Sequence, residues 1–381
     1  MIDRVTFEQG TLDLAARAAS PGAAGDLWLR ACAAYTPPTL TTVGEAIQQG
    51  WYGEEEHAKD NYLSVAVEQQ WWPADMALAT ARTALGTLGA DAAQLGLLTY
   101  TSIHRHGHAR LWQPAAALQH ALGASQALAF SLAHGCNGMF VASRVALDTL
   151  AGASGGKDAL VIGSDRFGTS SFDRWRGDYG VVYGDAAAAA LFGHAPGFAK
   201  VQLLSIAGVP ELEGMHRHVD EHAEHAGHRD AARHEFGVRE SKKGFMERFG
   251  RERFFEAIGH ALTSLRDSAL KRFDLHANPA DWLLTPHVGQ AISAPLYEGM
   301  FRDLARRHFG AWGRQVGHTG TADQFLSLVA LARSGQLENG QRVLLIGSGA
   351  GFSCALMLLE VHDVSLAAKC EAIDATTAAF A

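Results

Sequence analysis

Residues 76–102 read MALATARTALGTLGADAAQLGLLTYTS, and this stretch contains the two patterns that decide the fold. Its first part places apolar residues at helical spacing and stops at Gly89, which is typical of a helix end. The LGLLTYTS run that follows is short and apolar without a polar alternation, which is typical of a strand buried on both faces. The stretch therefore predicts a helix followed by a core strand.

The same order of helix and strand recurs three times. The later pairs are residues 137–150 with 158–165, residues 254–273 with 281–287, and residues 324–335 with 341–349. This regular alternation predicts an α/β architecture of buried strands covered by helices. Because two pairs precede residue 170 and two follow residue 250, we expect two related halves. The expected segments are an N-terminal half at residues 1–195, a polar inserted segment at residues 196–250, and a C-terminal half at residues 251–381.

Composition excludes several classes of protein. The chain has 381 residues, of which 48% are apolar and 19% charged, as in a globular protein. No apolar run approaches the ~18 residues of a membrane span, and MIDRVTFEQG lacks the pattern of a signal peptide, so we expect a cytoplasmic protein without a membrane partner. The net charge of −8 argues against a nucleic-acid partner.

The cysteines and histidines do not indicate a metal site. The four cysteines are far apart and form no C-x-x-C pair, which disfavours a zinc knuckle and a disulfide framework. The inserted segment is rich in histidine, but its histidines alternate with Asp, Glu, Arg and Ala and lack apolar support, so we interpret it as a solvated insertion. We expect no metal and no other cofactor. The histidines concerned are His216, His218, His222, His225, His228 and His234.

Cys136 is the first candidate for chemistry. In FSLAHGCNGMFVASRVALDTL, an apolar run ends at the small-residue turn 135–138 and a helical pattern then begins. A helix N-terminus favours a thiolate over a thiol and could also hold an oxyanion. A buried structural cysteine is the alternative, but the flanking glycines favour a functional turn.

Three further stretches could complete a site. His287 ends the stretch DWLLTPH, directly after a predicted buried strand and a proline, where ligand crevices form in α/β proteins, although a surface histidine is the simpler interpretation. Asp323 begins the next helix after GHTGTA, either as a capping residue or as a carboxylate that orients a histidine. The glycines of IGSGAGFS do not have dinucleotide spacing, and we interpret them as a turn that approaches a reacting carbonyl.

Taken in order, these motifs resemble the thiolase-fold ketoacyl synthases of the type III class. The matching motifs are GCNGM, LVIGSD, YGDAAAAALFG, WLLTPH, GHTG and IGSGAGFSCAL. The resemblance implies a five-layered αβαβα fold of two similar halves, a homodimer, and a reaction in which a cysteine carries an acyl group as a thioester. It places the nucleophile on Cys136, the base on His287, and the oxyanion hole on the backbone N–H groups of Cys136 and Ala350.

One motif departs from the condensing enzymes. Where they have an asparagine that stabilises an enolate, this chain has His318, and the resemblance is closer to a subgroup of secondary metabolism that uses Cys-His-Asp. Asp323 matches the aspartate of that subgroup, whereas His318 and Asn137 are assigned to the acceptor side or to the support of the site. A carboxylate beside imidazole favours removal of a proton from an incoming nucleophile and disfavours a neighbouring enolate.

We therefore expect an acyltransferase of natural-product biosynthesis. It would take an acyl group from an acyl carrier protein or coenzyme A and pass it to a hydroxyl, amine or thiol on a small-molecule or carrier-bound acceptor. The alternatives are a decarboxylative 3-oxoacyl synthase III, a catalytically silent partner subunit, and a metal-dependent role for the histidine-rich segment.

Overall fold

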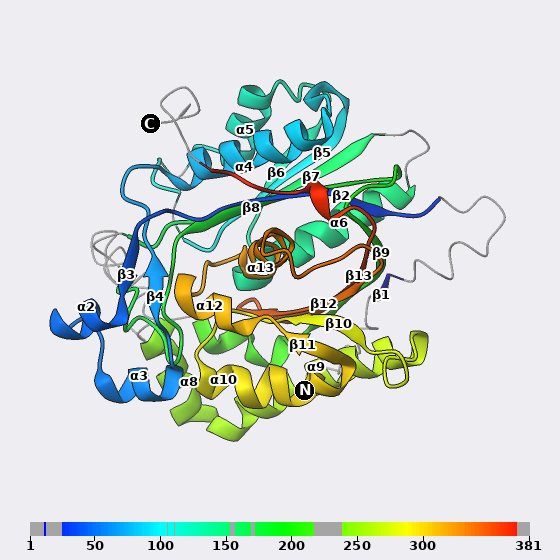
Figure 1. Ribbon diagram of the computed structural model, residues 1–381. Helices are drawn as coiled ribbons and strands as arrows, with labels where there is room; N and C mark the ends of the chain where they lie inside the picture. The colour runs from blue at the N-terminus through cyan, green and yellow to red at the C-terminus, as the bar shows by residue number, and fades with distance from the viewer. Residues whose placement is uncertain are drawn as a thin grey trace, which may run out of the picture.

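Two similar halves form the molecule in the computed structural model (Figure 1). The structure describes residues 11–12, 25–104, 106–109, 111–152, 157–168, 172–216 and 238–371. The four predicted helix–strand pairs are confirmed. They are α4 (Pro73–Leu88) with β5 (Leu95–Thr101), α6 (Gly138–Gly152) with β7 (Asp158–Asp165), α9 (Arg251–Arg272) with β10 (Ala280–Leu284), and α13 (Asp323–Arg333) with β12 (Arg342–Gly349).

The strand order is the same in both halves. The first half has the order β2-β8-β7-β5-β6, and the second has β9-β13-β12-β10-β11. In each half the last three strands of that order are parallel, and the two preceding strands alternate in direction. The remaining strands are β2 (Trp28–Tyr35), β6 (Leu128–Leu132), β8 (Ala186–Gly193), β9 (Ala199–Gly208), β11 (Ala305–His308) and β13 (Ser353–Val361). The predicted repeat of two halves is thus present in the topology.

The halves stack into the five layers expected of a thiolase-type fold (Figure 1). Helices α4 and α5 (Pro114–Leu122) cover the outer face of the first sheet half, and α9 covers the outer face of the second. Helices α6 and α13 form the central layer, where the rings of Phe140 and Phe325 lie 5.8 Å apart. The strands read as continuous apolar runs because helices cover both of their faces; in β8, for example, every residue is buried.

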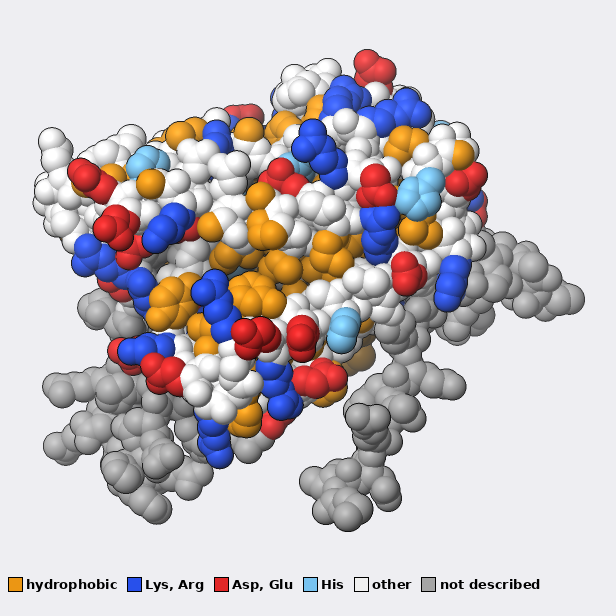
Figure 2. Space-filling model, turned by 90° about the horizontal axis from the view of Figure 1, so that it is seen from below, with side chains coloured by type: hydrophobic (Ala, Val, Ile, Leu, Met, Phe, Trp, Pro, Cys, Tyr) orange, Lys and Arg blue, Asp and Glu red, His pale blue; other side chains and the backbone are white. Residues whose placement is uncertain are grey.

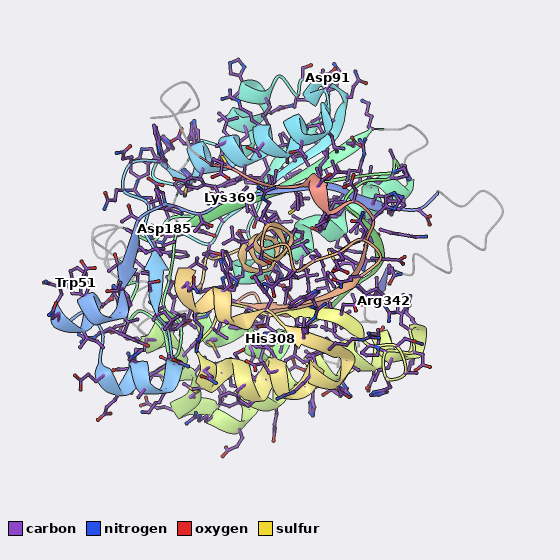
Figure 3. All side chains as sticks on the ribbon, in the orientation of Figure 1. Trp51, Asp91, Asp185, His308, Arg342 and Lys369 are labelled. Atoms are coloured by element: carbon purple, nitrogen blue, oxygen red, sulfur yellow. The ribbon has the colours of Figure 1, made fainter. Side chains whose placement is uncertain are left out.

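The smaller elements lie at the edges of this core. Beside it, β3 and β4 form a separate two-stranded sheet, β1 pairs with β9, and β14 pairs with β2. Buried Asp185, labelled in Figure 3, joins this region to the core by accepting hydrogen bonds from Arg174 and from the N–H groups of Glu68 and Phe167. The smaller helices and strands outside the core have the bounds β1 (Thr11–Leu12), β3 (Leu40–Thr42), α2 (Val43–Gln48), α3 (Glu54–Asp60), β4 (Ser64–Ala66), α8 (Val238–Phe249), α10 (Gln290–Ser293), α11 (Gly299–Phe301), α12 (Gly310–Val316) and β14 (Ala367–Lys369).

The expected inserted segment at residues 196–250 needs one correction. Its first part contains β9, which pairs with β13 and opens the second half of the sheet, so it belongs to the core. Its last part forms α8, which packs on the outer helical layer. Residues 217–237, which include most of the histidine-rich stretch, lie outside the described residues. Among the helices that the structure describes, none is both long and apolar enough to cross a membrane.

Candidate active site

Cys136 lies in the turn between β6 and α6. A single 3₁₀ turn, Gly135–Asn137, leads directly into α6, and Gly135 has a left-handed φ of +51°. The thiol side chain is partly exposed, whereas the other three cysteines are buried. The first N–H groups of a helix have no partner within the helix and favour an anion. The sequence thus places a reachable thiol at the positive end of a central helix.

A second glycine turn, residues 347–351, packs against this cysteine turn. A Cβ atom at Gly349 would lie 2.8 Å from the backbone nitrogen of Cys136, and one at Gly135 would lie 2.3 Å from the carbonyl oxygen of Ala350. Glycine is required at both positions because the backbone of the opposite turn fills the space where a side chain would begin. The main chains of Cys136 and Ala350 therefore lie side by side. The oxyanion role of their N–H groups stays a prediction.

His318 is the imidazole that contacts the thiol. Its Nε2 lies 3.0 Å from the Sγ of Cys136. The residue lies in the turn between α12 and α13, where its N–H donates to the carbonyl of Val182 and its own carbonyl accepts from the N–H of Gly184. The ring of Tyr183 packs on the imidazole at 5.2 Å between centroids. The main chain of the loop that precedes β8 therefore fixes the imidazole of His318 against Cys136.

Asp323 holds the far side of this imidazole. The Nδ1 of His318 lies 2.6 Å from Oδ2 of Asp323, which also accepts the backbone N–H of His287 at 2.8 Å. The other carboxylate oxygen accepts the N–H and the hydroxyl of Thr319, both at 2.7 Å. Because a carboxylate only accepts, Nδ1 of His318 carries a proton and Nε2 can exchange one with Sγ. The structure therefore brings Cys136, His318 and Asp323 together in one line.

The expected contact between Cys136 and His287 is wrong. The ring of His287 lies on the other side of Asp323, where its Nδ1 is 3.0 Å from the carbonyl oxygen of Gly317 and its Nε2 is 2.6 Å from the hydroxyl of Ser327. Both ring nitrogens are thus engaged within the protein, and His318 holds the place beside the sulfur. The sequence could not distinguish the two histidines because both follow a strand or a turn that points to the same edge.

The charges of the line follow from its buried environment. Burial alone would lower the pKa of His318, but the Asp323 carboxylate and the Cys136 sulfur together raise it well above its ordinary value. Burial would raise the pKa of Asp323, yet His287 and His318 hold it below its ordinary range. Burial lowers the pKa of His287. These shifts favour an imidazolium at His318 beside the Asp323 carboxylate and a neutral imidazole at His287.

Asn137 supports the cysteine turn from behind. Its side chain is fully buried, and its Nδ2 donates to the hydroxyl of Ser353 on β13 at 2.7 Å. The Nε2 of His134, two residues before the cysteine, lies 2.8 Å from the same hydroxyl. These contacts tie the turn to the second half of the sheet.

Sequence reasoning missed three residues around the site. Asp165, at the end of β7, accepts N–H bonds from His104 and from Thr321 in the loop after His318. Ser327 contacts His287, and Tyr183 packs on His318. Ser327 lies four residues after Asp323 on α13, a spacing that places both on one helix face and was the signal available.

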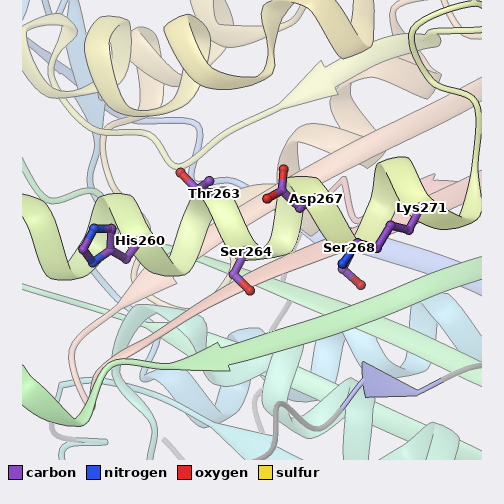
Figure 4. A pocket seen from close by; sticks show the side chains of 6 residues that line it. All are labelled: His260, Thr263, Ser264, Asp267, Ser268 and Lys271. Carbon is purple, nitrogen blue, oxygen red and sulfur yellow. The ribbon is translucent and has the colours of Figure 1, made fainter.

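Other features of the surface do not join this site. In the part of the chain that the structure describes, no three His, Cys, Asp or Glu side chains are grouped to hold a metal ion. A groove lies along α9 in the outer helical layer (Figure 4). Cys136 instead directly precedes α6 of the central layer. Its lining residues are His260, Thr263, Ser264, Asp267, Ser268 and Lys271.

Comparison with known proteins identifies the family of the chain. A family model described as 3-oxoacyl-[acyl-carrier-protein (ACP)] synthase III C terminal matches residues 270–361. The beta-ketoacyl-[acyl-carrier-protein] synthase III of Citrobacter koseri is 30% identical over 291 residues, which cover 74% of this chain and 81% of that protein.

Solved structures share the fold over almost the whole chain. ChlB3, described as an acyltransferase, has a TM-score of 0.80 and 27% identity, and the match covers 90% of this chain and 99% of that one. The priming beta-ketosynthase from the R1128 polyketide biosynthetic pathway has a TM-score of 0.67 and 21% identity, covering 90% of this chain and 98% of that one. These matches confirm the family and the fold that the sequence motifs predict.

Proposed function

This chain belongs to the beta-ketoacyl-[acyl-carrier-protein] synthase III family of enzymes, and within it we propose an acyltransferase that carries the acyl group on Cys136 and passes it to a hydroxyl, amine or thiol. The observation that carries the proposal is the line of Cys136, His318 and Asp323, with Nε2 of His318 at 3.0 Å from Sγ. Such a line generates a nucleophile in the first half of the reaction and a general base in the second.

In the first half-reaction the Cys136 thiolate attacks the carbonyl carbon of an acyl thioester. A carbon–sulfur bond forms, and the carbonyl oxygen takes the negative charge in a tetrahedral intermediate. We assign its stabilisation to the N–H of Cys136 and to the glycine turn at Ala350. When the intermediate collapses, the donor's carbon–sulfur bond breaks and the His318 imidazolium gives its proton to the departing thiolate.

In the second half-reaction His318 is neutral and its Nε2 is free to accept a proton. An acceptor O–H, N–H or S–H attacks the Cys136 thioester while Nε2 removes its proton, and the Asp323 carboxylate stabilises the imidazolium that forms. The second tetrahedral intermediate expels the Cys136 thiolate, which restores the ion pair with His318.

The same geometry disfavours decarboxylative condensation. That reaction needs neutral donors directed at the oxygen of an enolate, whereas the residue in the place of the condensing enzymes' asparagine is an imidazole paired with a carboxylate. His287 cannot be a second donor in this position because its ring nitrogens are engaged with Gly317 and Ser327. A negative charge on Asp323 next to the site would oppose an enolate.

The donor is proposed to be an acyl carrier protein or acyl-coenzyme A. The face on which α8, α9 and α10 lie has an apolar hollow ringed by charged side chains of both signs (Figure 2). On α8 and α9, Arg248 and Arg253 lie over the exposed ring of Phe249, and Arg251 lies over that of Phe255. Guanidinium groups supported in this way suit the phosphate of a carrier or of coenzyme A.

A homodimer is proposed from the open edge of the first sheet half. Strand β6 pairs with β5 on one side within the described residues, and Leu128 on β6 is 67% exposed. An exposed edge strand with an apolar side chain is a template for pairing with a second copy. Sedimentation equilibrium should give a dimer for the natural chain and a monomer for Leu128→Lys; a natural chain that sediments as a monomer would contradict the assembly.

Mass spectrometry of the intact protein tests the catalytic proposal. The chain is incubated with a panel of acyl thioesters and then with alcohol, amine or thiol acceptors. We expect an acyl adduct that is absent in Cys136→Ala and that disappears when the right acceptor is added. Consumption of malonyl thioester with release of CO₂ and a new carbon–carbon bond would instead establish a condensing enzyme.

A further inference from the structure

We propose that Ser327 is a positioning residue that acts through His287 on the imidazole of His318. Ser327 touches neither Cys136 nor His318 among the contacts of the described residues. Its hydroxyl lies 2.6 Å from Nε2 of His287, whose opposite ring nitrogen lies 3.0 Å from the carbonyl oxygen of Gly317. Gly317 immediately precedes His318, so the ring of His287 links the helix to the turn that presents the imidazole. The inference rests on the proposed function.

The hydrogen bonds fix which ring nitrogen of His287 carries its proton. A carbonyl oxygen only accepts, so the Nδ1 of His287 must be the donor to Gly317. In a neutral imidazole the other nitrogen is then an acceptor, and the Ser327 hydroxyl donates to it. Without this hydroxyl, Nε2 of His287 would be a buried acceptor with no partner. Moving the ring proton to Nε2 would then leave the lone pair of Nδ1 facing the Gly317 carbonyl.

The linked carbonyl belongs to a turn that requires glycine. Gly317 has a φ of +78°, and a Cβ at this position would meet the side chain of Val65 at 2.9 Å. His287 therefore holds a peptide group whose conformation side-chain-bearing residues avoid. The same peptide is held at its other polar group by Val182, whose carbonyl accepts the His318 N–H, and the ring of His318 shifts when either hold is lost. The 3.0 Å distance between Nε2 of His318 and Sγ of Cys136 depends on the position of this peptide.

Helix α13 supplies both anchors of the arrangement. Asp323 and Ser327 lie one helical turn apart, and His287 lies between them, with its N–H on Asp323 and its Nε2 on Ser327. The main-chain bond to Asp323 does not depend on the imidazole. Removing the Ser327 hydroxyl therefore leaves the carboxylate its backbone donors and acts on the ring of His287, whose Nδ1 lies 3.0 Å from the Gly317 carbonyl oxygen and 3.4 Å from Oδ1 of Asp323.

Alkylation of Cys136 by iodoacetamide tests this role without any knowledge of the acyl donor. The rate of adduct formation is followed by intact-mass spectrometry at pH 6 and pH 9.5, with Cys136→Ala as the blank. At pH 6 alkylation needs the imidazole to hold the thiolate, whereas at pH 9.5 a thiol of ordinary acidity is ionised without help. For Ser327→Ala we expect alkylation about tenfold slower at pH 6 and unchanged at pH 9.5.

Two further variants make the result decisive. Ser143→Ala is the matched control, because Ser143 is a buried serine on the other central helix whose hydroxyl has no hydrogen-bond partner within the described residues. It should leave both rates unchanged, and Ser327→Thr, which keeps a hydroxyl, should restore the rate at pH 6. Equal rates at pH 6 for the natural chain and Ser327→Ala would overturn the positioning role, as would an equal loss at both pH values. If the natural chain itself shows no enhanced alkylation at pH 6, the ion pair of the proposed function fails instead.

Discussion

The Nε2 of His318 lies 3.0 Å from the Sγ of Cys136, although the two residues are 182 positions apart in the chain. They meet because α6 and α13 lie side by side in the central layer, and each is preceded by a turn that carries one of the two side chains. The twofold repeat of the fold thus brings the Cys136 thiol from one half against the His318 imidazole and the Asp323 carboxylate from the other.

Replacing Asp323 by asparagine should slow acylation of Cys136 at neutral pH by about a hundredfold. The carboxylate raises the pKa of His318, so its loss lowers that pKa and with it the share of the ion pair. The asparagine amide would also point an N–H group at donors whose hydrogen bonds the Asp323 carboxylate accepts. Adduct formation by intact mass at pH 7 measures the effect. Asp303→Asn, which changes an exposed carboxylate paired with Arg266, serves as the control and should keep the natural rate; an undiminished rate in Asp323→Asn would restrict Asp323 to helix capping.

A methyl group at Gly349 should separate the glycine turn from the cysteine turn. The added Cβ would lie 2.6 Å from the backbone nitrogen of Asn137 and 2.8 Å from that of Cys136, and neither backbone can yield. We expect Gly349→Ala to lower the acylation rate about a hundredfold, as for the loss of an oxyanion donor. Gly259→Ala on α9, where nothing lies within 4 Å of the added atom, should have no effect. A fully active Gly349→Ala would argue that this turn does not touch the reacting carbonyl.

Asp165 should make stability depend on pH. Burial raises its pKa to about 7, although N–H groups of His104 and Thr321 partly oppose this. Because the folded value lies above the unfolded one, the contribution of Asp165 is full below about pH 4 and is lost as the pH rises through 7. The unfolding free energy of the natural chain, taken relative to that of Asp165→Asn, should therefore fall by about 2–3 kcal/mol from pH 5 to pH 7.5. Urea denaturation at both pH values measures this difference, and a constant difference would mean that Asp165 is ionised at both.

Much of the core could be predicted from local patterns. The run DALVIGSD coincides with β7, because a strand covered on both faces is apolar throughout. Strand β2, in contrast, lacks a continuous apolar run, since Arg30 interrupts WLRACAAY. That arginine is accommodated by Asp158 at the start of β7, a partner more than a hundred residues away. A pairing of this kind has no local signal.

The site shows the same division. Cys136 and Asp323 stand at helix starts that the sequence reveals, and both lie in the observed line. The choice between His287 and His318 depends on which ring faces the sulfur, and this orientation is set by Gly317, Ser327 and the loop at Tyr183. None of these contacts follows from spacing along the chain, so the motif alone assigned the wrong histidine to Cys136.

The comparison of His318→Ala with His287→Ala tests the central claim most directly. Each purified variant is mixed with an acyl thioester that acylates the natural chain, and the adduct on Cys136 is followed over time by intact mass. We expect His318→Ala to form it at least about a hundredfold more slowly, whereas His287→Ala, which keeps the N–H on Asp323, loses far less. A His318→Ala variant that acylates at the natural rate while His287→Ala does not would contradict the account.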